Sequence, residues 1–170
     1  MAGLDFEVIP SGCDENISVD TPEKLVLELS RLKCGDVAAK APAGRLVIGS
    51  DTVVVSEGRI LGKPHDGADA FRMLRELCGN THTVYTGVSI IDTDSSKGFS
   101  FCDKTDVTMY DVPDEAIRKY IATGEPMDKA GAYAIQGKGA FLVEKINGDF
   151  YTVMGLPISH LLKVLHTQFR

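Results

Sequence analysis

The feature that most constrains the fold is an apolar run of ten residues with one acid inside it. Residues 46–55 read Leu-Val-Ile-Gly-Ser-Asp-Thr-Val-Val-Val, and such a β-branched run is typical of a strand buried on both faces of a sheet. A buried carboxylate is costly unless it has a proton, a cation or several donors, so Asp51 is a candidate functional residue. The alternative is that the strand ends at Gly49 and that Asp51 is a turn residue bonded to its own backbone.

The remaining periodicities predict strands and helices that alternate along the chain, which favours an α/β fold with a mixed β-sheet flanked by helices. Leu25, Leu29 and Leu32 have helical spacing within the first helix. A long glycine-rich loop covers residues 124–139. The expected strands are 4–9, 46–55, 83–91 and 99–109, and residues 141–146 and 150–153 are expected to form a hairpin. The expected helices are 22–39, 113–122 and 157–169. A further helix, capped by Asp66 or Asp69, is expected to carry Ala70, Met73, Leu74 and Leu77.

Length and composition narrow the class of protein. At 170 residues with 44% hydrophobic and 25% charged side chains, the chain fits a single globular domain over residues 1–170. The net charge of -6 is the wrong sign for general attraction to nucleic acid, so we expect no nucleic-acid partner. The apolar runs are too short to span a bilayer, and the four scattered cysteines indicate a reducing cytoplasm, not a disulfide framework or a zinc site.

Several polar residues on predicted loops are weaker candidates. Lys63 follows the apolar strand and could reach an anionic ligand, although most loop lysines are simply solvated. Asp128 and Lys129 lie among glycines that permit close backbone approach, but an ordinary surface loop has the same composition. Gln136 offers an amide that can donate to and accept from a base edge. His82 at a strand start is more typical of a structural histidine than of a catalytic base.

Six motifs occur in a fixed order along nearly the whole chain. They are VIGSDTVV at 47–54, GKP at 62–64, HTVYTGV at 82–88, TGEPMDKAGAY at 123–133, IQG at 135–137, and GDFY at 148–151 followed by GLP at 155–157. Together they resemble the Maf family of nucleoside triphosphate pyrophosphatases. The resemblance implies an elongated fold of two lobes with a central cleft, similar to that of the inosine triphosphate pyrophosphatases. It also implies cleavage between the α and β phosphates of a nucleoside triphosphate, giving the monophosphate and pyrophosphate.

The resemblance assigns roles to individual residues. Asp51 matches the family's proposed general base, and Glu15, Lys33 and Lys63 match polar residues of its substrate site. The family's activity depends on a divalent cation, Mg²⁺ or Mn²⁺, which an acidic protein needs to bind a triphosphate. Carboxylates would hold that cation, with Asp51 and Glu15 as candidate ligands. The sequence does not separate the roles of base and metal ligand for Asp51.

Two further matches concern the substrate. Thr52 and Gln136 match positions of the family branch that prefers dTTP and UTP. The alternatives are the branch that acts on 7-methyl-GTP, a broad pyrophosphatase that removes modified nucleotides, or a nucleotide-binding regulator linked to septum formation. A homodimer is expected at the family level only.

The sequence departs from the family pattern at its start. Family members begin with a strand followed by Ser-x-Ser-Pro-Arg-Arg at the start of a helix, and this chain begins after that point. We therefore expect an N-terminally truncated form, or a misassigned start codon. A truncated form would lack backbone and arginine donors for the phosphates, and its activity would be impaired.

Overall fold

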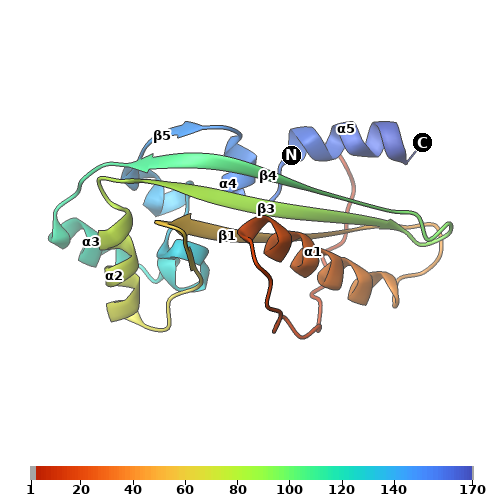
Figure 1. The fold of residues 1–170 in the computed structure, drawn as a ribbon, viewed down its shortest axis with the longest axis horizontal. Helices are drawn as coiled ribbons and strands as arrows, with labels where there is room; N and C mark the ends of the chain where they lie inside the picture. The colour runs from red at the N-terminus through yellow and green to blue at the C-terminus, as the bar shows by residue number, and fades with distance from the viewer. Residues whose placement is uncertain (1–2, 170) are drawn as a thin grey trace. The chain divides into compact units, whose positions relative to one another are not determined.

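The computed structural model in Figure 1 describes residues 3–169, which form an α/β fold with helices packed against a sheet. The strands are β1 (Leu46–Ser56), β2 (Arg59–Leu61), β3 (Thr81–Asp92), β4 (Gly98–Met109) and β5 (Val143–Asn147). They lie in the sheet in the order β2-β1-β3-β4-β5. The α-helices are α1 (Pro22–Ala38), α2 (Gly67–Leu77), α3 (Asp114–Ile121), α4 (Phe150–Met154) and α5 (Ile158–Gln168), and short 3₁₀ helices are η1 (Glu125–Asp128), η2 (Ala130–Ala132) and η3 (Gly137–Leu142).

The sheet is antiparallel, whereas the sequence predicted a mixed sheet. Val54 of β1 lies opposite Leu61 of β2, and Val107 of β4 lies opposite Ile146 of β5. Figure 1 shows β3 running opposite to both β1 and β4. The reason is that helix α2 joins β2 to β3, two strands that run in the same direction but have β1 between them. The crossover through a helix therefore creates no parallel neighbours.

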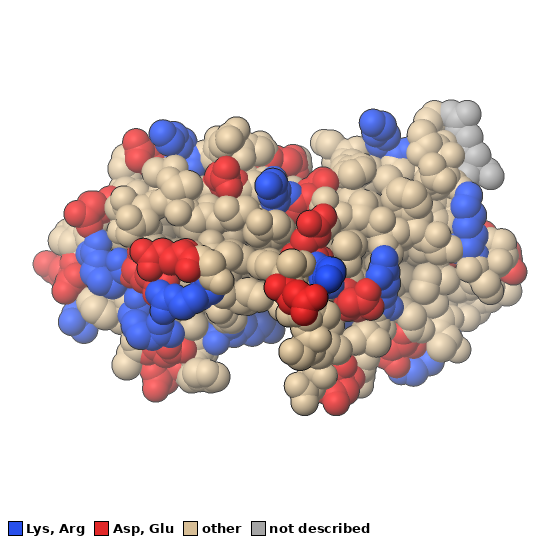
Figure 2. Space-filling model, viewed as in Figure 1, with Lys and Arg blue, Asp and Glu red and all other residues tan. Residues whose placement is uncertain are grey.

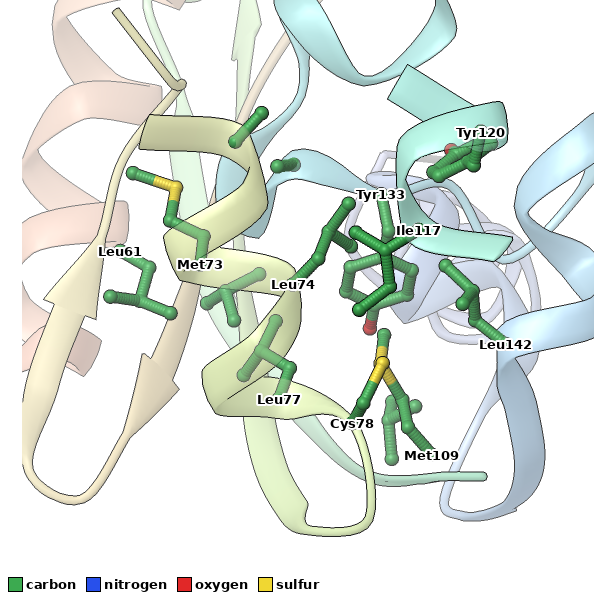
Figure 3. Close-up of a cluster of buried hydrophobic side chains, with 14 of the residues drawn as sticks. Leu61, Met73, Leu74, Leu77, Cys78, Met109, Ile117, Tyr120, Tyr133 and Leu142 are labelled. Carbon is green, nitrogen blue, oxygen red and sulfur yellow. The ribbon is translucent and has the colours of Figure 1, made fainter. Parts of the chain in front are cut away.

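The chain divides into two compact units, and each has its own buried cluster. Unit 1 holds the described residues through 51 together with 86–103 and those from 155 onward, and unit 2 holds 52–85 and 104–154. In unit 1 the cluster joins α5 to β3 and β4 through Val88, Ile90, Phe101, Leu161 and Val164. In unit 2 the cluster in Figure 3 includes Leu61, Met73, Leu74, Leu77, Cys78, Met109, Ile117, Tyr120, Tyr133 and Leu142. The single domain expected over residues 1–170 stays a prediction.

Within unit 1, helix α1 packs closely on strands β1 and β3 because each presents a glycine beneath it. A Cβ added to Gly49 of β1 would lie 2.6 Å from both the amide nitrogen of Cys34 and the carbonyl oxygen of Ser30. A Cβ added to Gly87 of β3 would lie 2.3 Å from the carbonyl oxygen of Val26. Real Cβ atoms do not approach backbone so closely, so both glycines are needed for this packing.

The predicted strand over residues 4–9 is wrong, because this segment has no regular structure. Its apolar side chains face solvent, and Phe6 is 82% exposed. Alternating apolar and acidic residues fit a strand only where a neighbouring strand supplies hydrogen bonds and a surface to cover, and none of the described strands pairs with this segment.

The predicted hairpin of residues 141–146 with 150–153 is also wrong. Strand β5 pairs with β4, and residues 150–154 form helix α4. Asp149 explains the difference, because its Oδ2 accepts hydrogen bonds from the amide (2.7 Å) and hydroxyl (3.1 Å) of Thr152. An acid with this contact is a helix N-cap, which stops the extended chain before a second strand can form.

The remaining helices and strands lie close to where the sequence predicted them. Asp66 caps α2 by accepting a hydrogen bond of 2.8 Å from the amide of Asp69. This helix carries Ala70, Met73, Leu74 and Leu77, as predicted, and these four are its buried residues. Within residues 3–169 no helix combines the length and the apolar composition that crossing a membrane requires.

Candidate active site

Asp51 lies inside strand β1, so the alternative of a turn residue is wrong. Its side chain is 12% exposed, and its Oδ1 lies 2.6 Å from Nζ of Lys33 on helix α1. The same Nζ lies 3.2 Å from Oε2 of Glu15 in the segment before the helix. Three of the four residues that the resemblance assigned to one site, Asp51, Glu15 and Lys33, therefore meet around a single ammonium group in unit 1.

Electrostatics keep that ammonium group charged. Burial alone lowers the pKa of Lys33, but hydrogen bonds and the negative charges of Asp51 and Glu15 raise it above its ordinary value. The close packing of α1 over Gly49 brings Lys33 within reach of the strand, because Ser30 and Cys34 on the same helix lie against that glycine. The local fold thus fixes a carboxylate and an ammonium group side by side.

A second group of charged residues gathers in unit 2. Nζ of Lys129 lies 2.8 Å from Oδ1 of Asp128. The amide of Gly131 donates a hydrogen bond of 3.0 Å to the carbonyl of Gly62, which ties this loop to the residue before Lys63. The hydrogen bond from Lys129 is the main cause that lowers the pKa of Asp128, and the charge of Lys63 adds to it.

The two candidate specificity residues lie in different segments of unit 2. Thr52 follows Asp51 on β1 and is half-buried, whereas Gln136 is exposed and precedes η3. Gln136 has extended backbone, with φ -107° and ψ 174°. As an exposed residue, Gln136 is accessible to a ligand, as reading a nucleobase would require.

Comparison with known proteins gives the family. The model of the family described as "Maf-like protein" matches residues 1–168. The chain belongs to this family. The resemblance to the Maf family, drawn from the six motifs, is thereby confirmed.

Three similar relatives carry the name "dTTP/UTP pyrophosphatase". The protein of Thermoanaerobacter sp. (strain X514) is 50% identical over 167 residues, covering 98% of this chain and 87% of the relative. The protein of Thermosipho melanesiensis is 47% identical over 165 residues, covering 97% and 87%. The protein of Alkaliphilus metalliredigens is 49% identical over 167 residues, covering 96% and 85%.

His82 of the Maf-like chain is buried, in agreement with the structural interpretation. Its Nε2 lies 2.8 Å from the hydroxyl of Tyr133, and the residue is 2% exposed. Burial lowers its pKa to about 4, although the charge of Asp106 acts in the opposite direction. The imidazole is therefore neutral at pH 7 and holds Tyr133 in the core of unit 2.

The sequence reasoning missed residues that support the motifs. Ser50 next to Asp51 directs its hydroxyl to the carbonyls of Gly155 (2.6 Å) and Gly87 (3.1 Å), so it ties three Maf motifs together. Glu125 accepts hydrogen bonds from the backbone amides of Lys138 and Gly139, which follow Gln136 in the same loop. The signal for both was their place inside the motifs, because Glu125 interrupts no apolar run and Ser50, although it lies in the same run as Asp51, carries no charge that would be costly to bury.

The residues present fit a divalent cation in their chemistry. Among residues 3–169 no three His, Cys, Asp or Glu side chains gather into a metal site. Mg²⁺, however, uses one or two carboxylates and takes its other ligands from water and substrate phosphates. Asp51 and Glu15 would supply that donor set, and both contact Lys33, which would have to shift for them to share one ion.

Proposed function

We propose that this chain is a nucleoside triphosphate pyrophosphatase that hydrolyses the bond between the α and β phosphates of dTTP and UTP. The products are the nucleoside monophosphate and pyrophosphate. The observation that carries the proposal is the carboxylate of Asp51, which the family's longest strand motif holds inside β1 against Lys33. Support for the nucleotide comes from the relatives named above.

Asp51 and Lys33 suit the chemistry of this hydrolysis. A water oxygen forms a bond to phosphorus, its proton passes to the Asp51 carboxylate, and the electron pair of the broken anhydride bond leaves with pyrophosphate. The Lys33 ammonium provides positive charge for the anionic phosphates and the leaving group. The alternative role for Asp51 is to bind the cation, and then another group would take the proton.

A bound Mg²⁺ or Mn²⁺ would neutralise phosphate charge and stabilise the developing charge on pyrophosphate. Asp51 and Glu15 are the residues that would hold it.

On the face shown in Figure 2, acidic and basic side chains lie intermixed. With a net charge of -6, the chain must bind a polyanion through local groups, for which Lys33, Lys63 and Lys129 are the candidates.

Gln136 and Thr52 are proposed to read the pyrimidine. Uracil and thymine share an O4 acceptor and an N3–H donor, and a glutamine amide can pair with both. A site built this way rejects bases with a different edge, since its own polar groups are then left unpaired. The cytoplasmic location and the homodimer that the resemblance implies stay predictions.

A panel of triphosphates tests the proposal. Pyrophosphate release is measured with dTTP, UTP, dCTP and 7-methyl-GTP at the same Mg²⁺ concentration. We expect dTTP and UTP to be cleaved fastest. Faster cleavage of 7-methyl-GTP would place the chain in the other branch of the family, and binding of nucleotide without cleavage would favour a regulator.

A further inference from the structure

The loop that carries Gln136 is held by one carboxylate outside the proposed set of site residues. Oε1 of Glu125 accepts a hydrogen bond of 2.9 Å from the amide of Gly139, and Oε2 accepts one of 3.1 Å from the amide of Lys138. These amides lie two and three residues after Gln136. Glu125 itself follows Gly124, which has φ 76°, so the chain turns back toward the loop at this point.

Tyr120 of helix α3 holds the other side of the same loop. Its hydroxyl donates to Oε1 of Glu125 at 3.0 Å and accepts from the amide of Ala134 at 3.1 Å. Ala134 lies two residues before Gln136. Tyr120 is 2% exposed and belongs to the core of unit 2 in Figure 3, so the hydroxyl is anchored in a packed environment.

The glycines on either side of Lys138 fit this arrangement. Gly137 has φ +70°, and a Cβ there would lie 3.0 Å from Oε2 of Glu125. A Cβ on Gly139 would lie 2.5 Å from the hydroxyl of Tyr120. Larger residues at either position would displace the carboxylate or the phenol, which accounts for the glycines after Gln136.

The protonation states of Glu125 and Tyr120 favour the same hydrogen bonds near neutral pH. The amide of Lys138 is the main cause that lowers the pKa of Glu125, despite the opposing effect of desolvation. Desolvation raises the pKa of Tyr120, and the neighbouring Glu125 raises it as well. The carboxylate therefore stays an acceptor and the phenol stays a donor.

We infer that Glu125 and Tyr120 are positioning residues that fix the backbone on both sides of Gln136 so that its amide can select the pyrimidine base. This inference rests on the proposed function and deepens it. Neither residue needs to touch the nucleotide. They act by holding the 134–139 segment in one conformation, which avoids an ordering cost when the base binds.

The test compares Glu125→Gln with Glu144→Gln, an exposed acid of β5 that serves as the matched control. Glutamine keeps the shape of Glu125 but has one acceptor oxygen, and its NH₂ group would face an amide donor. We expect KM for dTTP to rise about tenfold, the scale of lost hydrogen bonds to a charged group. The preference for dTTP over dCTP should fall, and the control should leave both unchanged.

A double variant separates positioning from general loss of structure. In a background of Gln136→Ala, adding Glu125→Gln should have little further effect on the ratio of dTTP to dCTP cleavage. Tyr120→Phe should reproduce part of the loss. Equal reduction of both substrates by Glu125→Gln, or additive effects in the double variant, would overturn the inference.

Hydrogen exchange gives a readout that does not depend on activity. The amides of Lys138 and Gly139 should exchange faster in Glu125→Gln than in the wild-type chain, with the amides of α2 unchanged. Unchanged exchange at both amides would contradict the inference by itself. A wild-type chain that cleaves neither dTTP nor UTP would instead contradict the proposed function.

Discussion

At the scale of single residues, the site depends on charges placed where the fold gives them little freedom. Asp51 is 12% exposed and Lys33 is 23% exposed, so each side chain is mostly removed from water but has the other as a partner. Removing one member of such a pair leaves a poorly solvated charge, which costs more than the pair itself contributes. The pair is therefore a fixed part of unit 1 as well as a candidate for chemistry.

His82 makes stability depend on pH. Its pKa in the folded chain is about 4, below the value of about 6.5 expected in the unfolded chain. Because the folded state disfavours the proton, this contribution is fully present above pH 6.5 and is lost as pH falls toward 4. Between pH 7 and pH 5 the loss should be about 2 kcal/mol.

Urea unfolding of His82→Gln at both pH values checks this prediction. The variant is expected to be less stable at pH 7, because the hydrogen bond to Tyr133 changes, but its stability should vary less between the two pH values. His65→Gln, at an exposed position, is the control and should keep the full difference. An equal difference in all three proteins would mean that His82 does not cause it.

At the scale of elements, helix α1 shows how packing decides which face is buried. The spacing of Leu25, Leu29 and Leu32 predicted the apolar face, but Leu32 is 38% exposed. The buried residues are Val26, Leu29, Ser30 and Cys34. Glycines beneath the helix leave room only for small side chains and backbone at the contact, so a serine and a cysteine lie there and the larger Leu32 faces outward.

Gly49→Ala tests whether this close contact positions the site. The added Cβ would lie 2.6 Å from two backbone atoms of α1, and such overpacking typically costs about 1–3 kcal/mol. We expect a lower melting temperature and, because Lys33 moves with the helix, slower cleavage of dTTP.

Gly35→Ala is the matched control for that experiment. Gly35 lies in the same helix, and a Cβ there meets no atom within 4 Å. Alanine is the better helix former, so the control should be as stable as the wild-type chain or more stable. If Gly49→Ala melted at the wild-type temperature, the helix would have another way to accommodate the strand.

At the scale of the whole molecule, the sequence predicted long regular elements better than contacts. Strand β1 and helix α2 were predictable because an apolar run and a side-chain cap are local signals. The segment 4–9 was not, because its alternation requires a partner strand that no local pattern reveals. That the whole sheet is antiparallel was missed for a similar reason, since it depends on where β2 and β3 lie relative to β1.

In the candidate site, too, residues with a local signal were predictable and residues that act through distant contacts were not. Asp51 was found because a charge interrupts an apolar strand, which is visible in the sequence. Its contact with Lys33 joins residues 18 positions apart, and only the family resemblance pointed to that lysine. Glu125 was missed because its role lies in contacts with backbone amides, whose positions depend on how the loop turns.

Product analysis with dTTP tests the central claim most directly. The wild-type chain with Mg²⁺ should convert dTTP to dTMP and pyrophosphate in equal amounts. Asp51→Asn should keep the wild-type circular dichroism spectrum but lower kcat by at least about a hundredfold, the scale of general acid–base catalysis. Formation of dTDP and phosphate, or near-normal turnover by folded Asp51→Asn, would contradict the account.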